Sequence, residues 1–200
     1  MKPLIFCLII MLTTPAMGQQ SYIDSIKEYL SGYVNKHEVV TGDSKRFLRF
    51  FPVNEDYRVV AKFTKATGNS WFQMETSGSI KKTFRVYGVL QFAINDTAVV
   101  LNLYQSQNLM NLGEYKDHLF LPFTDLTSGE LTYSAGRYID LKMSDIVENV
   151  VVIDFNKSYN PYCAYVSGKY NCPIPPKENQ LPVSILAGEK NFLKPLARAF

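Results

Sequence analysis

The sequence predicts a mainly β protein, a single antiparallel barrel- or sandwich-like domain with one N-terminal helix packed on it. The alternative is a mixed α+β fold. Three observations lead to this prediction: many short segments alternate apolar and polar residues with a period of two, one segment has clear helical spacing, and no strand–helix–strand alternation occurs. The composition of 46% hydrophobic and 14% aromatic residues over 200 positions excludes a disordered tail or a coiled coil. The net charge of +3 is too small to indicate nucleic acid as a partner.

The first 18 residues have the pattern of a secretory signal peptide. Lys2 precedes an apolar run at residues 4–12, and Ala16 and Gly18 form a small-residue cleavage pattern. An apolar run this short does not span a bilayer as a permanent anchor. We therefore expect cleavage near Gly18, a mature domain over residues 19–200 without a membrane span, and a periplasmic or extracellular location. A buried N-terminal helix or strand is the less favoured alternative.

Residues 21–34 are predicted to form the helix. Ser21 and Asp24 have the spacing of a capping box, which satisfies free N–H groups of the first turn. Apolar residues then recur on one face of the helix, at Ile23, Ile26, Leu30, Tyr33 and Val34. Such a stripe is typical of a helix that docks on a sheet. Residues 108–117 are the other segment with helical character.

Period-two patterns predict the strands. Gly88 is expected to mark a bulge, and Asn95-Asp96-Thr97 a tight turn that joins two strands in a hairpin. The predicted strands are 46–51, 57–64, 70–76, 84–94, 98–104, 119–123, 137–141, 150–155 and 183–186.

Familiar catalytic and cofactor motifs are absent from the sequence. It contains no GxGxxG, GxxxxGK[ST], HExxH or GxSxG pattern, so no cofactor is expected. The two histidines, His37 and His118, are far apart in the chain, which excludes a His-rich metal site but not a site of one histidine with carboxylates. We predict no metal and read each histidine as an ordinary surface or core residue.

A polar loop at residues 123–140 is the first candidate for function. Asp125 begins a run of turn-forming residues, and Arg137 opens a strand directly after Gly136. The guanidinium of Arg137 could pair with Asp125 and pin the loop, or it could clamp an anionic ligand. Both interpretations stay open from the sequence.

The second candidate segment runs from Asp154 to Asn179. Its four prolines indicate an ordered loop. Cys163 and Cys172 are the cysteines that remain after the signal peptide is removed, so an exported chain would pair them as a disulfide. Redox, nucleophilic and metal-binding uses are the alternatives, each lacking the spacing or the partners that it normally has.

Long motifs in these segments and ahead of them make a family resemblance visible. They are FFPVNEDYRVVAKF, EYKDHLFLPFTDLTSGELTYSAGRYIDL, VVIDFNKSYNPYCAY and YNCPIPPKENQLPVSILAGEK. The sequence resembles, over about residues 36–190, the bacterial family called domain of unknown function 1684, in a short exported form of the Bacteroidetes type. The resemblance implies no activity, because none is established for the family. It directs attention to Asp125, Thr132, Tyr133, Gly136, Arg137, Asp154, Asn156, Asn160, Cys163, Cys172, Glu178 and Asn179. Ser134 stands where the family usually has glycine.

Three functions remain open, and whether the protein is an enzyme is uncertain. The first is a binding module for a small polar or anionic ligand, held between the 125–137 and 154–179 segments by Asp125, Tyr133, Arg137, Asn156, Asn160 and Asn179. The second is a hydrolase or transferase with Asp125, Asp154 and Glu178 as candidate catalytic carboxylates, which would have to share a cleft. The third is a purely structural envelope protein. The sequence does not predict the oligomeric state.

Overall fold

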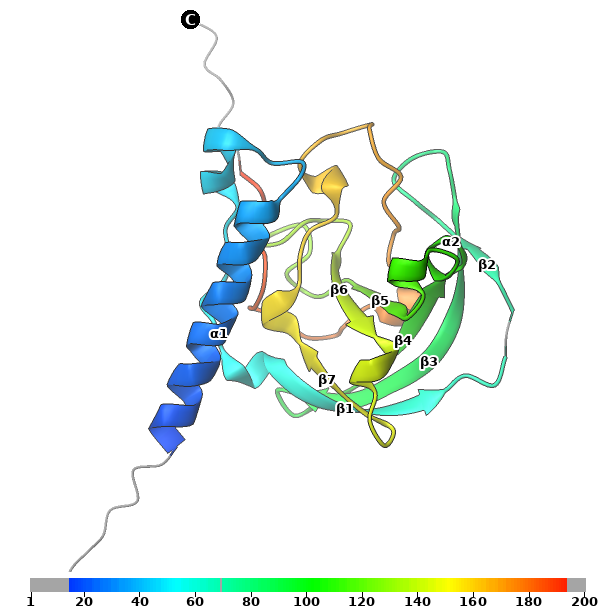
Figure 1. Ribbon diagram of the computed structural model, residues 1–200, viewed down its shortest axis with the longest axis horizontal. Helices are drawn as coiled ribbons and strands as arrows, with labels where there is room; N and C mark the ends of the chain where they lie inside the picture. Colours follow the sequence, from blue (N-terminus) through cyan, green and yellow to red (C-terminus); the bar gives the residue numbers. More distant parts are fainter. Residues whose placement is uncertain (1–14, 69, 194–200) are drawn as a thin grey trace, which may run out of the picture.

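A seven-stranded antiparallel sheet forms the centre of the protein and curls into a half-barrel (Figure 1). The computed structural model describes residues 15–68 and 70–193. The strands follow the order β6-β5-β4-β3-β1-β7, and the short β2 pairs with β3. Their bounds are β1 Arg58–Lys65, β2 Phe72–Met74, β3 Lys82–Ile94, β4 Thr97–Ser106, β5 His118–Phe123, β6 Arg137–Lys142 and β7 Val150–Asp154. The predicted mainly β architecture with an N-terminal helix is confirmed.

The β3–β4 hairpin is the longest pairing in the sheet and follows from local sequence. Asn95 and Asp96 have φ values of 48° and 59°, so the two-residue turn has the left-handed geometry that matches strand twist. The register shifts between Val86 and Gly88, which confirms the predicted bulge. A Cβ at Gly88 would lie 2.2 Å from the ring of Phe63, so the bulge also needs glycine for close packing.

Each face of the sheet carries a separate apolar cluster. Along β5, Leu119, Leu121 and Phe123 belong to the larger cluster, whereas Phe120 belongs to the smaller one. Because successive side chains of a strand point to opposite faces, the smaller cluster covers the reverse side of the sheet. Its members are Met74, Phe84, Tyr104, Phe120 and Tyr138.

The helix α1, Pro15–Lys36, lies along one side of the sheet (Figure 1). It is longer at both ends than the predicted 21–34. Ile26 is buried, and two tyrosine hydroxyls fasten the helix to the rest of the chain. Tyr22 donates to the carboxylate of Asp154 at 3.1 Å, and Tyr33 donates to Glu189 at 3.1 Å. No helix in the described ranges has both the length and the apolar character that a membrane crossing needs.

Short helical turns connect the remaining elements. They are α2 Gln107–Met110 and the 3-10 turns η1 Gly42–Phe47, η2 Glu55–Tyr57, η3 Gly113–Tyr115, η4 Met143–Asp145, η5 Phe155–Lys157, η6 Tyr162–Ala164 and η7 Lys177–Asn179. The predicted helical segment 108–117 is therefore two short pieces, α2 and η3. Most of the predicted signal segment lies outside the described residues, and Gly18 lies within α1.

Two predicted strands are wrong. Residues 46–51 begin inside η1 and make a single isolated bridge, between Phe50 and Glu189. Residues 183–186 form no strand because side chains bind their backbone groups: the N–H of Ile185 donates to Asp125 and its carbonyl accepts from Arg137. Apolar alternation predicted both segments, but each makes only one or two backbone hydrogen bonds to a neighbouring segment and no continuous ladder.

Candidate functional site

A cleft of about 770 Å³ lies on the reverse side of the sheet, beneath the segment that carries the disulfide. Strands β3 to β6 contribute the floor, and residues 159–173 contribute much of the roof. Tyr29 and Tyr33 of α1 form one wall, and residues of α2 and η3 form another. Four separate parts of the chain therefore meet around one cavity.

The floor of the cleft is a continuous row of aromatic rings. Phe84 stacks on Phe120 with ring centroids 5.5 Å apart, and Phe120 meets Tyr138 edge to face at 4.7 Å. Tyr138 in turn contacts Tyr159 edge to face at 5.8 Å. These offset and T-shaped contacts are the favoured aromatic geometries. The row gives the cleft a rigid apolar base.

The roof is stapled by a disulfide between Cys163 and Cys172, which confirms the predicted pairing. Backbone bonds then tie it to the segment between β2 and β3: the N–H of Ser77 donates to the carbonyl of Cys172 at 2.9 Å. The N–H of Ile80 donates to the Asn171 side chain at 3.0 Å. On the other side, the hydroxyl of Tyr162 donates to Glu38 at 3.1 Å. The roof is thus held at both edges.

Three polar side chains of the lining form one hydrogen-bonded group. Nε2 of His118 lies 2.9 Å from Oδ1 of Asp140, and the hydroxyl of Tyr159 donates to Oδ2 of Asp140 at 2.7 Å. Burial, with the negative charge of Asp140 second, raises the pKa of Tyr159 well above its ordinary value. Tyr159 therefore stays protonated and acts as a donor at neutral pH. Each carboxylate oxygen of Asp140 has a partner.

Lys82 is the cationic side chain at the opposite end of the cleft. It is half-buried, and burial lowers the pKa of its ammonium group from the ordinary value. Among the residues that the structure describes, its ammonium has no hydrogen-bond or ion-pair partner. Lys82, Asp140 and Tyr159 were not among the residues predicted from the sequence, and His118 was predicted to be an ordinary surface or core histidine.

Arg137 and Asp125 form a buried ion pair with N–O distance 2.7 Å, and both side chains are 0% exposed. The guanidinium also donates to the carbonyls of Ile185, Ala187 and Glu189. Pairing of the two residues is one of the two interpretations that the sequence left open. This network holds the 185–189 segment against β6. Neither residue lines the cleft.

The predicted asparagines bind backbone groups of neighbouring segments. Asn156 exchanges hydrogen bonds with the backbone of Asn54, and Asn179 does the same with Asn102. Asn160 donates to the carbonyl of Lys190 at 2.9 Å. All three asparagines are buried. None of them lines the cleft, and their role as ligand-binding residues stays a prediction.

The remaining predicted residues are scattered. Asp154 accepts hydrogen bonds from Tyr22 and borders a separate concavity with Arg58 and Lys157. Glu178 is exposed on η7, and Tyr133 is half-buried with a pKa raised by burial. The three candidate carboxylates do not meet in either cavity: the cleft contains none of them, and the separate concavity contains only Asp154. Within the described ranges, no group of three or more His, Cys, Asp or Glu residues has an arrangement that could hold a metal ion.

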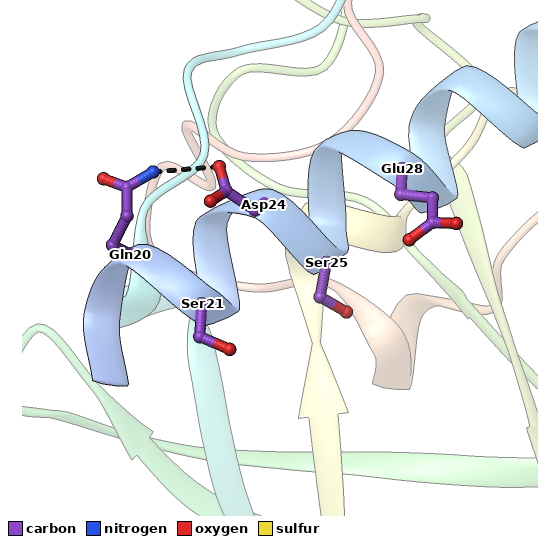
Figure 2. Close-up of a pocket in the computed structure, with 5 residues that line it drawn as sticks. All are labelled: Gln20, Ser21, Asp24, Ser25 and Glu28. Atoms are coloured by element: carbon purple, nitrogen blue, oxygen red, sulfur yellow. Dashed lines mark hydrogen bonds between the residues drawn. The ribbon is translucent and has the colours of Figure 1, made fainter. Parts of the chain in front are cut away.

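A further concavity on α1 has a different character (Figure 2). Its lining residues are Gln20, Ser21, Asp24, Ser25 and Glu28, all from this one helix and all exposed. The side chain of Gln20 donates to Asp24 at 2.9 Å, a bond between neighbours one helical turn apart. A helix face without a second wall does not enclose a ligand, so the cleft under the disulfide is the candidate site.

Fold and cleft together define a small half-barrel protein with a stapled loop over an aromatic sheet face. A solved structure shares this fold: the solution NMR structure of the uncharacterized protein from gene locus rrnAC0354 of Haloarcula marismortui. It superposes with a TM-score of 0.63 at 24% sequence identity, over 90% of this chain and 97% of that chain.

The family described as protein of unknown function DUF1684 matches residues 46–190, and the chain belongs to this family. The family that the motifs indicated is thereby confirmed. A search of the curated proteins finds no match. The matched range includes the floor and roof of the cleft but not α1, so the wall formed by Tyr29 and Tyr33 lies outside it.

Proposed function

We propose that the protein is a binding module that holds a small polar ligand containing a ring in the cleft. The observation that carries the proposal is the lining: nine of its nineteen residues are aromatic, around about 770 Å³. This volume falls in the range of small-molecule sites, which are lined mainly by apolar and aromatic groups with a few convergent polar groups. Ring faces favour a cyclic ligand because stacked and edge-to-face contacts add to burial.

One of the two segments that the sequence predicted to form a ligand site lines the cleft. Residues 159–173 belong to the predicted 154–179 segment and supply the roof. The other predicted segment, 125–137, does not line the cleft. Polar groups come instead from the sheet face, from Lys82, His118 and Asp140. Asp140 is the one carboxylate in this lining, so the cleft supports binding better than the two-carboxylate chemistry of a hydrolase.

Ligand-observed NMR tests this proposal with cyclic probes: benzyl alcohol, benzamide, benzoate, phenyl phosphate and methyl glucoside. We expect saturation transfer to at least one of them. Replacement of Tyr115, a lining residue that is 43% exposed, should weaken it without unfolding the chain. Leu112→Ala is the matched control, because Leu112 is 51% exposed in the same loop and does not line the cleft.

Two results would contradict the proposal. One is no saturation transfer to any of the cyclic probes. The other is equal binding by the wild type, by Tyr115→Ala and by a second variant, Leu109→Trp, which places a larger side chain in the wall. Thermal melting of each variant shows whether a loss of binding comes from the site or from the fold.

We also propose that the chain is the short exported form of the Bacteroidetes type, with a signal peptide that is removed near Gly18. The signal-peptide pattern of the sequence supports this, and the disulfide is compatible with an oxidising compartment. Intact mass measurement of the protein recovered from the periplasm or medium should give a mature chain that begins at Gln19. An unprocessed N-terminus would contradict the proposal.

A further inference from the structure

Lys82 belongs to the lining of a largely aromatic cavity, and its ammonium has no charged partner among the described residues. Its neighbour in sequence, Lys81, has an ordinary surface ion pair with Glu75, whereas Lys82 has no such partner among the described residues. A half-buried ammonium without a counter-charge has a desolvation cost, because it loses hydration and no ion pair compensates for the loss. The lowered pKa of Lys82, caused by burial alone, reflects this cost. A bound anion would remove it.

Two polar side chains, Ser106 and Asn108, line the cleft together with Lys82. Lys82 and Phe84 lie two positions apart on β3 and therefore on one face of the strand, and Phe84 pairs with Ser106 of β4. The Ser106 hydroxyl oxygen accepts from the N–H of Leu109 at 3.4 Å, which leaves its O–H as a donor. Lys82, Ser106 and Asn108 thus offer donors without an acidic side chain between them.

The one carboxylate of the lining stands at the other end. Lys82 is on β3 and Asp140 is on β6, and β4 and β5 lie between them in the sheet. Strands are spaced about 4.8 Å apart, so three spacings place β3 and β6 about 14 Å apart across the sheet. Asp140 is further engaged by His118 and Tyr159. An anion at Lys82 therefore avoids direct repulsion by Asp140.

We propose that the cleft selects a ring-bearing anion, with a carboxylate or phosphate monoester at Lys82 and the ring over the aromatic floor. This rests on the proposed function, because it assumes that the cleft binds a ligand. The aromatic floor fixes the ring by contact, and Lys82 supplies a charge-assisted hydrogen bond to the anionic group. A neutral compound with the same ring forgoes that bond.

A matched probe series tests the charge requirement. Benzoate, phenyl phosphate and benzamide share one ring and differ in charge, and their affinities are measured by NMR titration. We expect the acids to bind about tenfold more tightly than benzamide, the effect of one hydrogen bond to a charged group. Lys82→Met should abolish this preference, and Lys82→Arg should keep it. Lys81→Met is the control, since Lys81 is an exposed neighbour outside the lining.

The outcomes separate the two proposals. Loss of the acid preference in Lys82→Met, with the preference kept in Lys82→Arg and Lys81→Met, supports the anion site. Equal binding of benzoate and benzamide by the wild type, or a preference that survives in Lys82→Met, overturns it while the binding function stands. If no cyclic probe binds the wild type, both proposals fail. Preference for benzoate or for phenyl phosphate distinguishes a carboxylate from a phosphate ligand.

Discussion

Glu189 is a buried acid whose ionisation should make the stability of this protein depend on pH. Its side chain is 0% exposed and accepts hydrogen bonds from three donors. The hydroxyl of Tyr165 donates at 2.7 Å, the hydroxyl of Tyr33 at 3.1 Å and the N–H of Asn160 at 2.9 Å. Glu189 thereby joins its own segment to α1 and to the residues on either side of η6.

Burial raises the pKa of Glu189 from its ordinary value of 4.5 to about 7, against the lowering effect of its hydrogen bonds. Between these two pH values the folded protein holds a proton that the unfolded chain has released. The free energy of unfolding therefore falls as the pH rises through this window. Each unit of difference between the folded and unfolded pKa corresponds to about 1.4 kcal/mol, so the whole window amounts to roughly 3 kcal/mol.

Urea denaturation of wild type and Glu189→Gln, measured from below pH 4.5 to above pH 7, isolates this contribution. Other titrating groups are common to both proteins, so their effects cancel in the difference. Across this pH range the free energy of unfolding of the wild type should fall by roughly 3 kcal/mol more than that of the variant, because glutamine does not ionise. Parallel pH profiles for the two proteins would refute the reasoning. Urea is preferred to guanidinium because it adds no ionic screening.

Three other predictions concern the structural network. Arg137→Met leaves Asp125 as an unpaired buried charge and should lower the free energy of unfolding by about 3–5 kcal/mol, measured by urea denaturation. Gly188→Ala should be destabilising by about 1–3 kcal/mol, because φ is +75° and a Cβ would lie 2.6 Å from the carbonyl oxygen of Phe155. Gly42→Ala, with φ +54° and open space around it, is the control and should cost less. Joint replacement of Cys163 and Cys172 by serine should cost about 2.5–3 kcal/mol by the loop-entropy estimate, seen as a lower melting temperature.

Local sequence predicted the parts of the fold that depend on local geometry. The bulge at Gly88 and the turn at Asn95 and Asp96 require special backbone angles or close packing, which few residue types allow. Near this turn the two strands alternate buried and exposed residues clearly, because only one face of each is buried there. Residues 183–186 alternate in the same way, but the N–H and the carbonyl of Ile185 bond to the side chains of Asp125 and Arg137. Sequence spacing carries no information about such distant contacts.

The candidate site was harder to predict because strand side chains on the second face look like surface residues. His118 and Asp140 flank Phe120 and Tyr138 on adjacent strands, and an alternating pattern normally assigns such positions to solvent. They become the floor of a cleft because a segment beyond residue 155 folds back over them.

The polar loop residues that the sequence did indicate lie outside the cleft. Asn156 and Asn179 were prominent as polar groups, and the fold uses them to satisfy buried backbone groups.

The placement of α1 links the export prediction to the cleft. Cleavage after Gly18 would remove the first turn of the helix, which begins at Pro15, and would leave the residues that dock it. Tyr22 and Tyr33 keep their bonds to Asp154 and Glu189, and Tyr29 and Tyr33 keep their places in the wall. Since α1 precedes the range that the family matches, the wall is a feature that other members need not share. The floor and the roof lie within that range, so the aromatic base and the stapled loop are the parts of the site to compare across the family.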